Sequence, residues 1–223
     1  MSFILNIETA TKNCSVSIAK DGETIVCNEL ADEGYSHAEK LHVFIEEVIA
    51  KAGILAKDLN AVAVSQGPGS YTGLRIGVSA AKGLCYALNI PLIAVDTLHA
   101  LASQAGVTDG KIIPMLDARR MEVYSAIFNS DLTVERAIQA EIIDENSFQE
   151  YTEKLYFVGD CADKCKSVLT KDNFVFLEDI KYPSAKAMSK ISFDKYQKSD
   201  TVDVAYFEPY YLKDFMIAPP KKQ

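Results

Sequence analysis

The sequence of 223 residues contains none of the common motifs for binding metals or phosphates, or for nucleophilic hydrolysis. Its three histidines, His37, His42 and His99, form no HExxH or HxxxH pair. On a helix, His37 and His42 would point about 140° apart. There is no GxxxxGK[ST] loop, no GxGxxG fingerprint and no GxSxG elbow. We therefore expect no metal site and no locally assembled hydrolase centre.

Paired cysteines and long apolar runs are also missing. The five cysteines are odd in number and form no CxxC pair, which argues against a disulfide framework or a zinc ribbon. The first residues, MSFILNIET, indicate a strand rather than a signal peptide. No apolar run approaches the roughly 20 residues that span a bilayer. We expect free thiols in a cytoplasmic protein without a membrane partner, and a disordered tail at residues 218–223.

The charge balance disfavours autonomous binding to nucleic acids. Acidic residues number 31 against 23 basic ones, for a formal net charge of −8. Such a surface repels phosphate backbones unless basic residues gather locally. Hydrophobic residues make up 48% of the chain, enough for a sizeable core.

Apolar periodicity predicts an α/β fold made of two similar lobes. In the first lobe, an Asp-Gly turn joins two of the strands, and two helices cross over to parallel strands. We expect strands at residues 3–7, 14–19, 24–30, 61–65 and 91–95, and helices at 37–51 and 72–88. The first helix carries a capping box of Ser36 and Glu39.

The second half repeats the order of the first, with a strand, an acidic residue, a short loop and another strand. We expect strands at residues 112–116, 122–128, 138–143 and 155–158, and helices at 145–154 and 184–192. A helix within 97–105 would bridge the halves. The predicted domains are an N-terminal lobe at 1–106 and a C-terminal lobe at 107–217.

A glycine-rich loop, SQGPGSYTGLR, joins a buried strand to a helix N-terminus at residues 65–75. Free amides at such a terminus can receive an anion, and Gly67, Gly69, Ser70 and Thr72 would line the site. The alternative is a tight turn in which Thr72 caps the helix. Both interpretations remain open at this point.

Two carboxylates, Glu8 and Asp117, end the first strand of each lobe and would face each other across a cleft between the lobes. Together with Thr9 they could hold a metal-bound nucleotide. The alternative, which we favour, is that each carboxylate accepts backbone amides of its own hairpin loop.

The helix at 72–88 is apolar around most of its circumference and rich in small residues, with charge only at Arg75 and Lys82. Such a helix must be buried on more than one side. Either the fold covers it or a partner does, and we favour a partner.

Several segments together resemble the TsaB family of tRNA threonylcarbamoyladenosine biosynthesis proteins. They are SQGPGSYTGLRIGVSAAKGLCYALNIPLIAVDTLHALA, ILNIETATKNCSVSIAKDG, DARRMEVYSAIF and FEPYYLKDF. The resemblance implies an actin-like (Hsp70-like) ATPase fold with two ribonuclease-H-like lobes. It also implies kinship with TsaD, the catalytic, glycoprotease-like member, whose histidine pairs this chain lacks.

By this resemblance the chain is a non-catalytic subunit that binds and activates TsaD in transfer of the threonylcarbamoyl group to tRNA adenosine. It would reach TsaE through TsaD, form a homodimer when alone, and meet tRNA only indirectly. ATP or ADP with Mg would bind weakly or at the TsaD interface, if at all. The resemblance assigns docking to the two N-terminal helices, and the expected contact residues are His37, Leu41, Ile45, Leu74, Gly77, Val78, Ala81, Lys82 and Cys85.

An alternative makes the chain active on its own. It would be an actin-like ATPase or phosphotransferase using Glu8, Asp117 and the loop at 67–72, or a glycoprotease-like peptidase.

Overall fold

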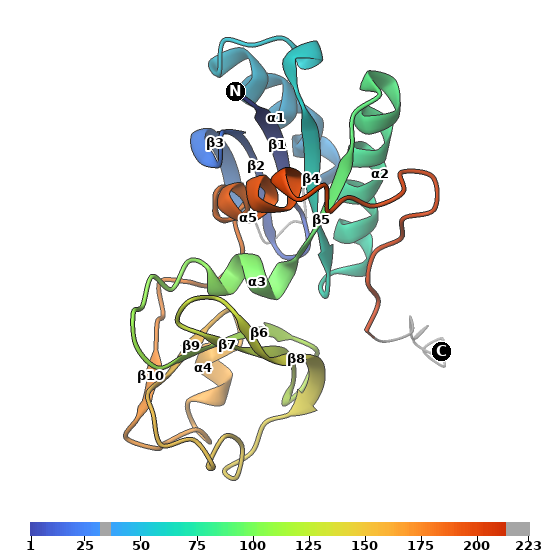
Figure 1. The fold of residues 1–223 in the computed structure, drawn as a ribbon. Helices are drawn as coiled ribbons and strands as arrows, with labels where there is room; N and C mark the ends of the chain where they lie inside the picture. The colour runs from blue at the N-terminus through green and yellow to red at the C-terminus, as the bar shows by residue number, and fades with distance from the viewer. Residues whose placement is uncertain (32–36, 213–223) are drawn as a thin grey trace, which may run out of the picture.

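A computed structural model describes residues 1–31 and 37–212, which form two lobes (Figure 1). The N-cap predicted at Ser36 and the tail predicted at 218–223 lie outside these residues. Within the described residues, no helix is long and apolar enough to cross a membrane. All five cysteines are free thiols, as predicted.

The first lobe is built on a five-stranded sheet in the order β3-β2-β1-β4-β5. β1, β2 and β3 are antiparallel neighbours, whereas β4 and β5 run parallel to β1. The turn between β2 and β3 places Asp21 and Gly22 at φ 49° and 89°, as the Asp-Gly signal predicts. The strands are β1 (Phe3–Glu8), β2 (Asn13–Lys20), β3 (Glu23–Ala31), β4 (Ala61–Gly67) and β5 (Leu92–Asp96).

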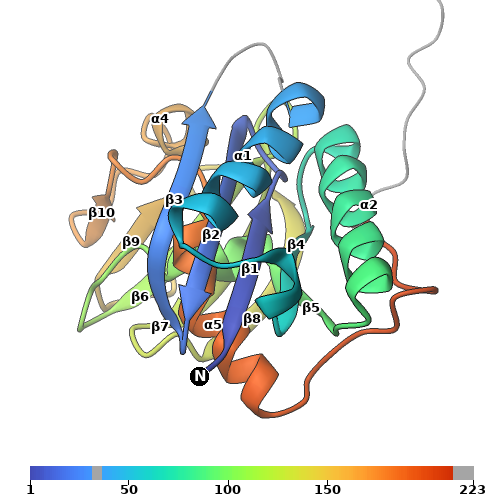
Figure 2. The same ribbon diagram turned by 90° about the horizontal axis from the view of Figure 1, so that it is seen from above.

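Helices cover both faces of this sheet, which explains why its central strands are apolar on both sides. α1 (His37–Lys51) and α2 (Tyr71–Leu88) lie side by side over one face (Figure 2). α5 (Ala185–Gln197) covers the opposite face. A short 3₁₀ turn, Ala56–Asp58, precedes β4.

The second lobe repeats the strand pattern of the first. Its sheet has the order β8-β7-β6-β9-β10, with β6, β7 and β8 antiparallel and β9 and β10 parallel to β6. This confirms the predicted internal repeat. The elements are β6 (Lys111–Asp117), β7 (Glu122–Asn129), β8 (Val134–Ile142), β9 (Leu155–Val158), β10 (Phe174–Phe176) and the short α4 (Ala162–Cys165).

The bridging helix is α3 (Thr97–Ala102), which contacts both lobes. It packs against β6 and β7 of the second sheet, and against β4, β5 and α5 of the first lobe. Leu98 and Leu101 are completely buried between these elements. The predicted bridge is therefore confirmed.

The structure changes the predicted lobe boundary, because the chain returns to the first lobe after residue 183. α5 packs on β1 and β2, and the segment after it makes an antiparallel bridge between Val202 and Leu92. The predicted C-terminal lobe at 107–217 thus contains residues that belong to the first. Local periodicity predicts a helix at this position, but it does not say which sheet the helix covers.

The helix predicted at 145–154 does not form. The Asp144 carboxylate accepts hydrogen bonds from the backbone amide of Asn146 at 2.9 Å and from the Ser147 hydroxyl at 3.1 Å. Such turns compete with helix formation, and Phe148 follows at φ 61°. The segment therefore forms successive turns.

Candidate functional site

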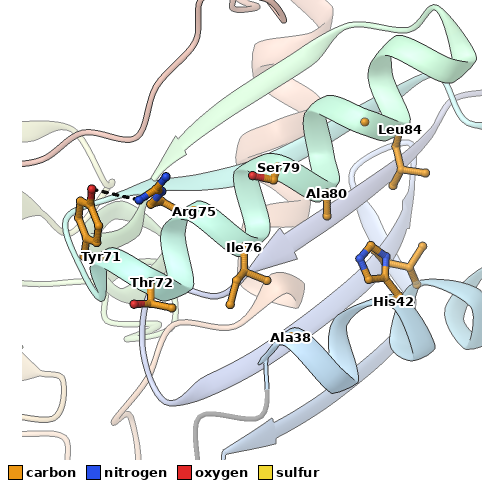
Figure 3. Close-up of a pocket in the computed structure, with 11 residues that line it drawn as sticks. Ala38, His42, Tyr71, Thr72, Arg75, Ile76, Ser79, Ala80 and Leu84 are labelled. Carbon is orange, nitrogen blue, oxygen red and sulfur yellow. Dashed lines mark hydrogen bonds between the residues drawn. The ribbon is translucent and has the colours of Figure 1, made fainter.

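A groove of about 710 Å³ lies between α1 and α2 (Figure 3). Its floor consists of small and apolar side chains: Ala38, Ile45, Ile76, Ala80, Gly83 and Leu84. His42 projects from α1 toward α2, and Tyr71 and Arg75 lie at the N-terminal end of α2 (Figure 3). The groove can accommodate an apolar element that approaches α2 closely.

α2 is held in place by caps at both ends. The Ser70 hydroxyl accepts a hydrogen bond from the backbone amide of Gly73 at 3.3 Å, so Ser70 is the N-cap. Asn89 closes the C-terminus in the left-handed region at φ 53°. The N-cap predicted at Thr72 is therefore wrong by two positions, and the exposed Thr72 lines the groove instead.

The residues expected to contact a partner lie mostly inside the first lobe. Lys82 is half-buried, and its ammonium donates to the backbone carbonyls of Ala205 and Phe207, both at 3.0 Å. Ile45 reaches the groove although it is only 5% exposed. Eight of the nine expected residues are buried: His37, Leu41, Ile45, Leu74, Gly77, Val78, Ala81 and Cys85.

These buried positions correct the predicted contact set. The positions of α2 that a partner can reach in the groove lie on the neighbouring stripe and include Ile76, Ser79, Ala80 and Gly83. The sequence shows that α2 is apolar around its circumference, but several stripes could face the sheet. Packing on β4 selects the stripe that contains Gly77 and Ala81.

His37 is a structural residue at the start of α1. Its Nε2 lies 2.7 Å from the carbonyl oxygen of Thr11, and burial lowers the pKa of its imidazole below the ordinary value.

The glycine-rich loop is closed by its own chain. The backbone amide of Ser70 donates to the carbonyl of Ala10 at 2.6 Å, and the Thr9 hydroxyl donates to the carbonyl of Gly73 at 2.8 Å. A Cβ atom at Gly69 would lie 2.4 Å from the Ala10 carbonyl oxygen. The glycines therefore allow the loop after β1 to cover the N-terminus of α2, and a phosphate does not fit there.

Glu8 is enclosed next to this contact. Its side chain is 0% exposed, and Oε1 accepts a hydrogen bond from the amide of Ala10 at 2.6 Å. Oε2 has no partner among the described residues. Burial raises the pKa of Glu8 to about 7, against the lowering effect of the Ala10 amide and of Ser65.

Asp117 occupies the matching position of the second lobe, but it is exposed. Its carboxylate accepts a hydrogen bond from the amide of Arg119 at 3.2 Å and pairs with Lys164. Glu8 and Asp117 therefore both bond the amide two residues further on, as the hairpin-capping alternative predicts. The enclosed Glu8 does not face Asp117 across an open cleft. No group of three potential metal ligands occurs in the described part of the chain.

One cluster at the end of the groove was not foreseen from the sequence. The Tyr71 and Tyr211 rings lie 4.9 Å apart, and Arg75 Nη1 donates to the Tyr71 hydroxyl at 3.2 Å. The amide of Tyr210 donates to the carbonyl of Gln66 at 2.7 Å and so anchors the C-terminal segment at this place. Only the tertiary structure brings Tyr211 beside residues 140 positions earlier in the chain.

Two lobes of repeated topology define an actin-like α/β protein, and structural comparison supports this class. Component A of the (R)-2-hydroxyglutaryl-CoA dehydratase of Acidaminococcus fermentans aligns with a TM-score of 0.52 at 10% identity, over 87% of this chain and 98% of that one. YeaZ from Pseudomonas aeruginosa aligns with a TM-score of 0.84 at 22% identity, over 95% of this chain and 100% of that one.

Sequence comparison identifies the family within this class. The family model of TsaD, the tRNA N6-adenosine threonylcarbamoyltransferase, matches residues 29–214. The tRNA threonylcarbamoyladenosine biosynthesis protein TsaB of Escherichia coli is 31% identical over 95% of this chain and 94% of its own length. The chain belongs to the TsaB family.

The sequence left open a phosphate site at the N-terminus of α2 and a metal-bound nucleotide beside Glu8. At the described N-terminus of α2, the Ser70 amide and the space beside Gly73 are both taken by the loop after β1. Glu8 has no exposed surface with which to meet a hydrated metal ion. As they lie, these residues do not fit a nucleotide phosphate.

Proposed function

We propose that this chain acts in tRNA threonylcarbamoyladenosine biosynthesis as a non-catalytic subunit, and that TsaD docks in the groove between α1 and α2 and is thereby activated. Membership of the TsaB family supports the pathway. The match to the TsaD family model supports a partner of related fold.

The observation that carries the docking proposal is a stripe of α2 that the described residues leave uncovered. Ile76, Ala80 and Leu84 pack on the first core only at its edge, and they line the groove next to Gly83. Apolar surface of this kind, gathered in a concave site, is typical of a protein interface. Small residues at the floor let a partner helix approach the backbone of α2 closely.

A non-catalytic role is supported by the hydrogen bonds of the two candidate carboxylates and of the glycine-rich loop, which are made within the chain. Glu8 and Asp117 cap their own loops, and the loop after β1 fills the N-terminus of α2. In this proposal the isolated chain uses the same groove to pair with a second copy, and TsaE is reached through TsaD. The net charge of −8 favours leaving most tRNA contacts to the partners.

The test uses Gly83→Arg, because among the described residues no heavy atom outside the adjacent backbone of α2 lies within 4 Å of a Cβ atom at Gly83. The new side chain projects from the surface of α2 at the groove without disturbing the fold. The matched control is Ala137→Arg, at an exposed position of β8 in the second lobe. Calorimetric titration with TsaD should give micromolar or tighter binding for the wild type and the control, and none for Gly83→Arg.

In a reconstituted assay, the wild type and Ala137→Arg should support threonylcarbamoyl transfer by TsaD, and Gly83→Arg should not. Absence of a wild-type complex at micromolar concentration would overturn the proposed function. Equal binding by Gly83→Arg and the wild type would move the docking surface elsewhere.

A further inference from the structure

The groove between α1 and α2 has an unbalanced charge. Of the residues that line it, Arg75 alone carries a permanent charge, and no aspartate or glutamate lines it. The side chain of Arg75 is exposed and forms an ion pair with none of the described carboxylates. A partner that covers the groove would therefore remove water from a cation for which the described residues supply no counter-charge.

Arg75 is held in place before any partner arrives. Its Nη1 donates to the Tyr71 hydroxyl at 3.2 Å, and its guanidinium carbon lies 5.3 Å from the centre of the Tyr71 ring. Tyr71 in turn packs on Tyr211, with 4.9 Å between the ring centres. This restraint lowers the conformational entropy that the arginine loses on binding, and leaves its other N–H groups available.

We propose that the partner helix presents an aspartate or glutamate carboxylate to Arg75, and that this pair selects the partner; the inference rests on the proposed function. A guanidinium buried without a counter-charge destabilises a complex, whereas a carboxylate matches its planar N–H groups with two parallel hydrogen bonds. Tyrosine and arginine are also among the residues enriched where interface energies are largest.

The geometry predicts where the acid stands on the partner. Arg75 and Gly83 are eight residues apart on α2, which corresponds to about 12 Å along the helix. A partner helix that runs along the groove meets Gly83 with a small or apolar residue and Arg75 with the carboxylate. These two partner residues should be separated by seven or eight positions.

The experiment measures TsaD affinity as a function of salt for the wild type, Arg75→Met, Arg75→Glu and the control Lys57→Met. Methionine keeps the aliphatic length of the side chain, and Lys57 is exposed on the 3₁₀ turn and does not line the groove. Arg75→Met should weaken binding by about 30- to 1,000-fold. It should also flatten the salt dependence, and Arg75→Glu should weaken binding further. Lys57→Met should bind as the wild type does.

Three outcomes would overturn the inference. In the first, Arg75→Met binds within about twofold of the wild type while Gly83→Arg abolishes binding. This result would support the docking surface but refute the carboxylate on the partner. A loss of affinity with an unchanged salt dependence would assign Arg75 to packing. If both variants bind like the wild type, the proposed docking surface fails as well. Unfolding midpoints equal to that of the wild type show that the exposed substitutions leave the fold intact.

Discussion

Substitution by alanine should change the stability of the protein in opposite directions at two glycines of α2. A Cβ atom at Gly77 would lie 2.3 Å from the hydroxyl oxygen of Thr9, whereas a Cβ atom at Gly83 would meet no described atom within 4 Å apart from the adjacent backbone of α2. In an exposed helix interior, Gly→Ala stabilises by about 1 kcal/mol. Gly83→Ala should therefore raise the melting temperature by about 2 to 4 °C.

Gly77→Ala should lower the free energy of unfolding, because the steric cost exceeds this gain in helix propensity. Forcing a methyl group against a buried neighbour costs about 1–3 kcal/mol. If the Thr9 hydroxyl turns away, its hydrogen bond to the Gly73 carbonyl is lost at about 1 kcal/mol more. After the gain is subtracted, the free energy of unfolding falls by about 1–3 kcal/mol, which corresponds to a fall of about 2 to 12 °C in melting temperature.

Removing the Thr9 hydroxyl tests whether it causes the loss of stability in Gly77→Ala. Without the Thr9 hydroxyl, the nearest atoms to the new methyl group at position 77 are 3.5 Å away, which is ordinary contact. In a Thr9→Ala background, Gly77→Ala should therefore keep the helical gain and stabilise the fold by up to about 1 kcal/mol. Urea unfolding of the wild type, the two single variants and the double variant measures the coupling. A stabilising Gly77→Ala in the wild-type background, or equal effects in both backgrounds, would refute the reasoning. The same contact makes Gly77 unsuitable for testing docking, because a large residue there disturbs the fold.

Two further predictions concern a buried acid and an anchored lysine. The pKa of Glu8 is about 7 in the folded chain and ordinarily 4.5, so the folded state binds this proton more tightly. The contribution of Glu8 to the free energy of unfolding should therefore fall by about 3 kcal/mol as pH rises from 4.5 to 7. Glu8→Gln should remove this component of the pH dependence of unfolding. Identical pH profiles for the variant and the wild type would contradict this. Lys82→Met removes the hydrogen bonds to the carbonyls of Ala205 and Phe207. The free energy of unfolding should therefore fall by about 0.5–1.5 kcal/mol, and proteolysis near residue 205 should become faster. An unchanged cleavage rate would show that the segment does not depend on Lys82.

Much of the fold follows from local patterns. The alternation in β2, the Asp-Gly turn and the helical spacing in α1 each predict an element that the structure contains. The same order of strands in the second half predicts a second lobe. The failed helix at 145–154 shows the limit of such patterns, because the side chain of Asp144 redirects the backbone locally.

The sequence by itself determined that α2 is too apolar to be covered on one side only. The tertiary structure decided which stripe of α2 faces the sheet, and it placed the expected contacts Gly77 and Ala81 in the core. It also decided that Thr9 rather than a phosphate meets the N-terminus of α2, and that Tyr211 lies beside Tyr71. Periodicity follows from backbone geometry within a few residues, whereas these contacts join positions far apart in the chain and depend on how whole elements pack.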